Sequence, residues 1–281
     1  MTQPMHRDFE PFELGDNMEE DLGLFEAATH ARRFDVAPLV VRHVLAVSGG
    51  AAPGVMPAAR GLATRLSATL VEDTTADSAD AMLAAAARLG AAVVVASAAL
   101  PESVVAGLVA PQPADPAVPI VLVPEAPSFA AAALDTLVLP LFTDAPATRR
   151  ACEWACGLAA AAGPQGVIHA LELASPDTRR AARRSRRGAA APGDATVGRT
   201  VAGGLGSIIA GLQRDATRHG FAVEVTFRGG RPGAELLAVV RGLGRPATAV
   251  LGRDDAPAVQ SPAAQLALDL VRSRAAVTLV A

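Results

Sequence analysis

The chain has 281 residues, a formal net charge of −3 at pH 7 and only 2 cysteines. This length suits two domains, each able to bury its own core, and the small net charge gives no general attraction to nucleic acid or to a membrane surface. Polar residues and prolines interrupt every apolar run well short of the roughly 20 residues that a membrane-spanning helix needs. Two cysteines exclude a disulfide framework. The first residues lack the pattern of a secretory signal, so we expect a cytoplasmic protein.

Residues 1–37 form an acidic N-terminal arm that differs from the rest of the chain. Acidic side chains outnumber basic ones here, and phenylalanines are spaced among them. Asn17 can cap a short helix that begins near Glu19, because Asn accepts a backbone hydrogen bond at the N-cap and acids suit the first turn. Two interpretations stay open. The arm lies on the protein's own surface, or it is a docking segment for a protein partner.

A first α/β unit is predicted over residues 38–128. Short β-branched runs that end at Gly, Pro or Ser predict strands at 43–47, 68–72, 92–96 and 119–123. Helices are predicted between them at 54–66, 77–89 and 101–109. Strands that alternate with helices imply right-handed crossovers and a parallel sheet that is covered on both faces.

A second and longer α/β unit is predicted over residues 129–281. Its strands are expected at 137–141, 167–171, 222–227, 247–251 and 277–280. Its helices are expected at 146–162, 201–219, 233–243 and 262–274. The same order of patterns thus appears twice, which indicates a tandem duplication in which the first unit has lost one strand and one helix. The last strands of the two units are sheet edges, so we expect them to pair with each other.

An arginine-rich loop interrupts the second unit between its second strand and its second helix. It spans residues 175–198 and contains Arg179, Arg180, Arg183, Arg184, Arg186 and Arg187. The run is typical of a solvated surface loop. Guanidinium groups also pair bidentately with phosphate oxygens, so polyanion binding is the alternative. No aromatic residue accompanies the arginines, which argues against single-stranded nucleic acid as a partner.

Cysteine and histidine offer few candidates for chemistry. Cys152 and Cys156 share one face of a predicted helix, where they are expected to be buried core side chains. No histidine or acid cluster accompanies them, so no metal site is predicted. His43, His169 and His219 lie at the edges of predicted elements, and we expect them to be packed or exposed without partners.

Several segments in order resemble a universal stress protein domain. LDTLVLPLFTDAPATRRACEWACGLA, from Leu134 to Ala159, is similar to the opening strand, acidic turn and first helix of that family. FAVEVTFRGGRPGAELLAVVRGLGRPATAVLGRDD is similar to the later strand, helix and strand, and RSRAAVTLVA to the closing strand. In the first unit, AMLAAAARLGAAVVVASAAL and VPIVLVPE repeat two of these blocks. The resemblance covers nearly all of residues 40–281.

The resemblance implies two tandem Rossmann-like α/β units with open parallel sheets of strand order 3-2-1-4-5, the first one shortened. It also implies a cytoplasmic stress-response role and association through the last strand, either within the chain as a pseudo-dimer or in a homodimer. One branch of the family binds ATP. That branch uses a Gly-x2-Gly-x9-Gly-Ser/Thr loop, in which backbone amides and small residues admit phosphates.

The nucleotide loop is incomplete in this sequence. Gly252 matches the first glycine, but Asp255, Gln265 and Leu266 fill the other positions of the pattern. The acid that the family carries at the end of the first strand is displaced here to Asp144. Should a nucleotide bind nevertheless, the contacting residues are expected to be Ser48, Gly49 and Gly50 in the first unit and Thr143, Asp144 and Gly252 in the second.

Three functions are compatible with this sequence. The first is a universal-stress-type binding or regulatory protein with degenerate nucleotide pockets, which needs no cofactor and is not an enzyme. The second is an ATP-binding switch or slow ATPase with the same pocket residues. The third is a scaffold that its acidic arm recruits to an assembly. The sequence shows no nucleophile–base pair and no metal cluster, which favours the first.

Overall fold

The computed structural model describes residues 39–48, 54–110, 112, 118–124, 132–141, 146–174, 203–253, 262–273 and 276–281. The N-terminal arm and the arginine-rich loop lie outside these ranges. The described strands are β1 (His43–Val47), β2 (Thr69–Asp73), β3 (Val93–Ser97), β4 (Ile120–Val123), β5 (Thr136–Leu141), β6 (Val167–Ala174), β7 (Ala222–Gly229), β8 (Thr248–Leu251) and β9 (Val277–Val280).

The helices follow the strands in close alternation. They are α2 (Val55–Arg65), α3 (Ala79–Leu89), α4 (Glu102–Val109), α5 (Pro146–Ala162), α7 (Gly203–His219), α8 (Pro232–Gly242) and α9 (Pro262–Ser273), with short 3-10 turns at Ala132–Leu134 and Gly163–Gln165. Local signals set several ends. The Ser78 side chain accepts a hydrogen bond from the Ala81 N–H, and α3 ends at Gly90 with φ of 60°, as expected for an N-cap and a left-handed C-cap. None of the described helices is long and apolar enough to cross a membrane.

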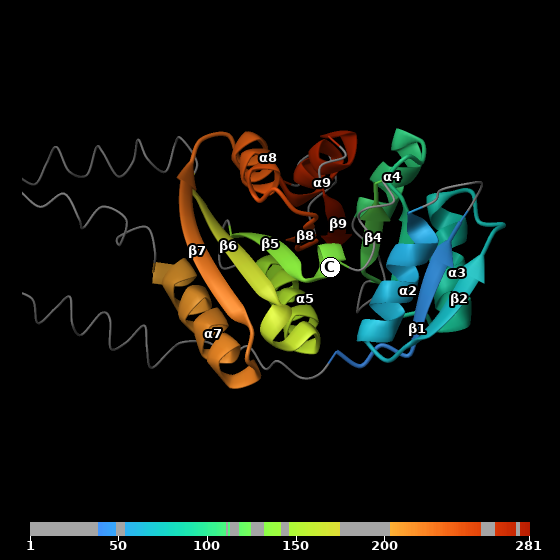
Figure 1. The fold of residues 1–281 in the computed structure, drawn as a ribbon. Helices are drawn as coiled ribbons and strands as arrows, with labels where there is room; N and C mark the ends of the chain where they lie inside the picture. Colours follow the sequence, from blue (N-terminus) through green and yellow to red (C-terminus); the bar gives the residue numbers. More distant parts are fainter. Residues whose placement is uncertain are drawn as a thin grey trace, which may run out of the picture.

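The strands form one nine-stranded sheet of order β2-β1-β3-β4-β9-β8-β5-β6-β7 (Figure 1). The part from β7 to β9 has the order 3-2-1-4-5 that the resemblance implied, and all its neighbours are parallel. The part from β2 to β4 has the same order without the outermost strand. The predicted α/β fold class is confirmed. We call residues 39–124 the first half and residues 132–281 the second half.

The two halves meet at a pair of antiparallel strands. β4 pairs with β9 in the register Ile120↔Val280, Val121↔Leu279 and Leu122↔Thr278. This register places a local two-fold axis at the Val121↔Leu279 pair. A half-turn about that axis exchanges the pair on one side, Ile120↔Val280, with the pair on the other side, Leu122↔Thr278. The two closing strands therefore pair with each other as the sequence predicts, and neither is left as a free edge of the sheet.

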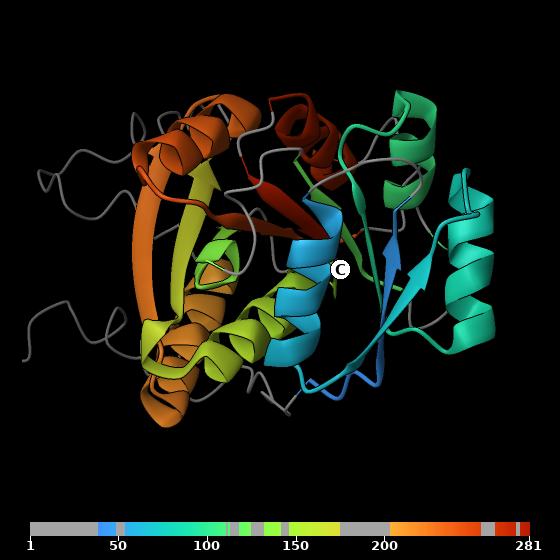
Figure 2. The ribbon, with the colours of Figure 1, turned by 45° about the vertical axis from the view of Figure 1, so that its right-hand side comes forward.

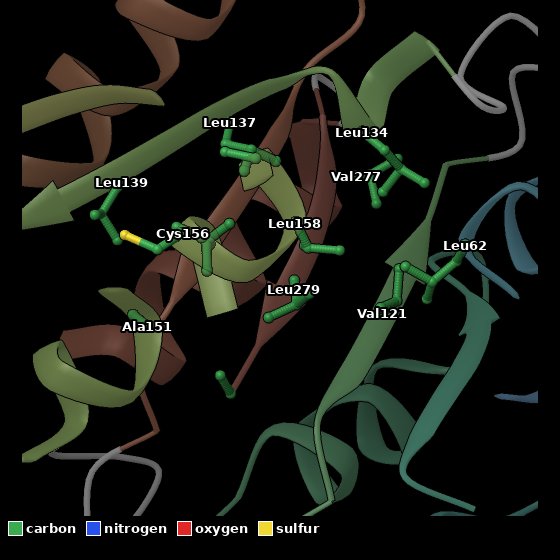
Figure 3. Packing of buried hydrophobic residues seen from close by; sticks show 14 of the residues in the cluster. Leu62, Val121, Leu134, Leu137, Leu139, Ala151, Cys156, Leu158, Val277 and Leu279 are labelled. Carbon is green, nitrogen blue, oxygen red and sulfur yellow. The ribbon is translucent and has the colours of Figure 1, made fainter. Parts of the chain in front are cut away.

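Two hydrophobic layers cover the sheet and both extend across the junction. One layer lies under α2, α5 and α7, and the other under α3, α4, α8 and α9. Figure 2 shows α2 and α5 side by side where the halves meet. In Figure 3, Leu62 and Val121 from the first half lie close to Leu134, Val277 and Leu279 from the second, all within the first layer. The halves thus share their core.

Candidate strand-end site

The candidate site of the second half lies where β5 and β8 end. The chain proceeds from β5 towards β7 on one side and from β8 to β9 on the other. In open α/β sheets, ligands bind at the carboxyl ends of the strands at such a switch point. Gly252 follows β8 there and is half-buried. Thr143, Asp144, Asp254 and Asp255 lie outside the described residues, so the structure brings no predicted site residue of this half together with Gly252.

Arg253 is the main feature that the sequence did not predict at this site. Its side chain is buried, with only 4% of the residue exposed. Its Nη2 donates a hydrogen bond to the Leu108 carbonyl in α4 at 3.1 Å, and Arg150 Nη2 donates to the Arg253 carbonyl at 2.5 Å. Burial, and then the neighbouring Arg150, lower the pKa of Arg253 to about 10. The Arg253 guanidinium thus bonds to the other half of the protein through Nη2.

The later positions of the nucleotide pattern lie inside a helix. Gln265 and Leu266 are the fourth and fifth residues of α9. The Leu266 side chain is buried, and Gln265 Nε2 donates to Asp269 Oδ1 at 3.1 Å. The backbone N–H of a fifth helical residue is already bonded within the helix. Neither position therefore offers a small side chain to a phosphate, and Leu266 offers no free amide.

Carboxylates accompany the candidate turn of the first half. Ser48 follows β1, and its Oγ donates to Glu72 Oε1 at 2.6 Å. Asp73, the next residue in β2, accepts hydrogen bonds from the Thr75 hydroxyl and N–H, which lower the pKa of Asp73. Gly49 and Gly50 lie outside the described residues. Two carboxylates at the end of β2 oppose an anionic ligand beside Ser48. Their signal in the sequence is the adjacent pair Glu72-Asp73 at the end of a strand.

His169 has a partner, which corrects the expectation that this histidine is unpaired. His169 lies in β6 directly opposite Glu224 in β7, and its Nδ1 is 3.1 Å from Glu224 Oε2. The two residues are far apart in sequence, so only the pairing of β6 with β7 shows the contact. Local sequence spacing carried no signal for it.

The cysteines occupy the core. Cys152 and Cys156 form no disulfide, and both are fully buried in α5. Burial raises the pKa of the Cys156 thiol well above its usual range. Within the described ranges, no three His, Cys, Asp or Glu side chains gather in a way that could hold a metal ion.

Comparisons with known proteins add a likeness of fold. No protein-family model matches the sequence, and no curated protein matches it. Among solved structures, the chain is similar to the crystal structure of a universal stress protein from Archaeoglobus fulgidus DSM 4304. The TM-score is 0.46 and the sequence identity is 12%, over 76% of this chain and 70% of that chain. At this level of similarity the match carries no conclusion about function.

Proposed function

We propose that this chain is a cytoplasmic binding or regulatory protein of the universal stress type, and that its two nucleotide pockets are degenerate. The observation that carries the proposal is the state of both strand ends. In the first half, Glu72 accepts a hydrogen bond from the Ser48 hydroxyl. In the second half, Gln265 and Leu266 lie within α9. Both ends lie where the family pattern would place a pocket, and of the pattern positions that the structure describes in the second half, Gly252 is kept while Gln265 and Leu266 depart from it.

The proposal includes a tandem origin with units over residues 38–128 and 129–281. The repeated strand order supports it, and so does the antiparallel β4–β9 pair, which joins the halves as two subunits would join through their last strands. We propose an intramolecular pseudo-dimer on this basis. A homodimer is the alternative, and the N-terminal arm remains the proposed site for a protein partner.

Titration calorimetry with ATP and magnesium tests the degenerate pockets directly. Each acid near a bound phosphate costs on the order of 1 kcal/mol at intermediate dielectric. Together with lost backbone contacts, this moves the expected Kd to about 1 mM or weaker. A Kd of about 10 μM or tighter contradicts the proposal and favours the alternative, an ATP-dependent switch or slow ATPase.

Restoring the glycines provides a matched variant. The double substitution Asp255→Gly with Gln265→Gly returns two positions of the pattern to the residue that the resemblance implies. We expect ATP to bind this variant at least about tenfold more tightly than the unchanged chain, which corresponds to about 1.4 kcal/mol. Glu224→Gln, on the exposed side of β7 and distant in the sheet from β8, serves as the control and should leave ATP binding unchanged.

A further inference from the structure

A cavity of about 230 Å³ lies between α4 and α9, where the two halves meet. The first half contributes Ala98, Ala99 and Leu100 from the loop after β3, with Glu102 and Val105 from α4. The second half contributes Leu268, Val271 and Arg272 from the last turns of α9. The cavity lies at the end of β3 and is separate from the strand-end site at β5 and β8.

Ala98, which lines this cavity, is the residue of the first half that corresponds in position to Arg253 of the second half. The Ala98 N–H donates to the Val123 carbonyl at 2.8 Å, which extends the parallel pairing of β3 and β4 beyond the strand. The Arg253 N–H donates in the same way to the Ala281 carbonyl at 2.6 Å and extends the pairing of β8 and β9. The local two-fold axis at Val121↔Leu279 relates the two arrangements.

The side chains of Arg253 and Ala98 differ in whether they reach the helix of the other half. Arg253 crosses to the last turn of α4 and donates to the Leu108 carbonyl. That carbonyl is one of the last four in α4, which have no partner within the helix and form the negative end of its dipole. Ala98 has only a methyl group, and it faces the last turns of α9 across the cavity. The space that a guanidinium fills in one half is therefore empty of protein atoms in the other.

We propose that this cavity binds a small organic cation with a guanidinium head, which takes the place that Arg253 fills in the second half. Glu102 lines the cavity and supplies a carboxylate. It is paired with Arg272 at 2.5 Å, but the two side chains are 65% and 51% exposed, so the pair opens at little cost. Arg272 keeps Asp269 as a second partner at 3.5 Å. This site does not depend on the proposed function.

Titration of the full chain with methylguanidinium chloride, followed by calorimetry, tests the proposal. We expect one saturable site per chain with a Kd of about 1 mM, which lies within the range for so small a ligand. Methylurea has nearly the same shape and no charge, and it should show no saturable binding. Saturation by methylurea at the same concentrations, or no saturation by methylguanidinium below about 10 mM, overturns the proposal.

Three variants locate the site. Ala98→Arg supplies the guanidinium covalently and should abolish binding. Glu102→Gln removes the carboxylate and should weaken binding about tenfold, as the loss of a charged hydrogen bond does, whereas Arg272→Gln removes the competing cation and should strengthen it. Glu153→Gln, at an exposed position of α5, should leave it unchanged. Undiminished binding by Ala98→Arg refutes the location. Should that variant fail to fold, the opposite shifts of Glu102→Gln and Arg272→Gln decide.

The reciprocal variant tests the equivalence of the two places. Arg253→Ala should open a second cavity of the same kind and lower the Tm. Methylguanidinium should then restore part of the lost Tm, and methylurea should not. Equal effects of the two compounds on the Arg253→Ala variant overturn the claim that a guanidinium is what these places accept.

Discussion

The contact between buried His169 and exposed Glu224 joins the last two strands of the sheet at the β7 edge. His169 is 7% exposed, whereas the side chain of Glu224 is 64% exposed. Burial lowers the pKa of His169, Glu224 raises it and Arg245 lowers it, and the net direction is downward. The neutral imidazole is therefore the form that the folded protein favours.

This pKa shift predicts a dependence of stability on pH. An unfolded histidine titrates near pH 6.5, so below that pH the unfolded chain binds more protons than the folded one. The stabilisation due to the neutral ring is complete above about pH 6.5 and decreases as the pH falls towards the lower folded pKa. Urea unfolding at pH 7.5, 6.5 and 5.5 should show a steeper loss for the unchanged protein than for His169→Gln. An equal loss of unfolding free energy with falling pH in the two proteins would show that His169 is not the source of the pH dependence.

The two cysteine thiols should be unreactive in the folded protein. Only the thiolate reacts, and burial both raises the pKa of Cys156 and closes access to Cys152. We expect a thiol-specific chromogenic reagent to label neither in the native state and both after unfolding. Glu153→Cys places a thiol between them on the exposed side of α5 and should react at once. Native labelling of the unchanged protein at the rate of this control would show that α5 opens.

At the scale of elements, β9 is the strand on which the shared core depends most directly. It pairs with β8 on one side and with β4 on the other, and Leu279 is fully buried at the two-fold pair. β7 differs, because it has one neighbour among the described strands and Val225 is 41% exposed. Substitutions in these two strands should therefore have very different effects.

Leu279→Ala should lower the free energy of unfolding by about 2–5 kcal/mol, because it removes a buried side chain and leaves a cavity. Val225→Ala at the edge should change it by less than about 1 kcal/mol. Urea unfolding monitored by circular dichroism measures both. A change below about 1 kcal/mol for Leu279→Ala would mean that the junction packs more loosely than the structure shows.

At the scale of the whole molecule, several kinds of contact connect the halves. The β4–β9 pair continues the sheet, Arg65 forms an ion pair with Asp135, and Arg253 bonds to α4. Hydrophobic side chains from both halves belong to the same clusters. Such sharing removes the boundary at which one half could unfold while the other persists.

The chain should accordingly unfold in one cooperative transition. Trp154 lies in α5 and reports on the second half, while hydrogen exchange of the β1 amides reports on the first. We expect the two probes to give the same urea midpoint, as a two-state transition requires. Separate midpoints would show that each half is an independent folding unit, and Leu279→Ala should then destabilise the second half more than the first.

The sequence by itself determined the elements and their order. Valine-rich runs such as those at 92–96 and 277–280 identify buried strands from local composition alone. The junction of β4 with β9 also followed from sequence, because two edge strands in one chain need partners. The buried positions of Cys152 and Cys156 followed from their spacing on one helix face.

Only the tertiary structure decided which distant side chains meet. Glu72 reaches Ser48, Glu224 lies opposite His169, and Arg253 crosses to α4 over 145 positions of sequence. Periodicity reports the face on which a residue lies, but the contact between two faces depends on strand register and on how the halves are joined. The cavity beside Ala98 has the same origin, since a missing side chain becomes a site only where two helices and a strand end enclose the space it leaves.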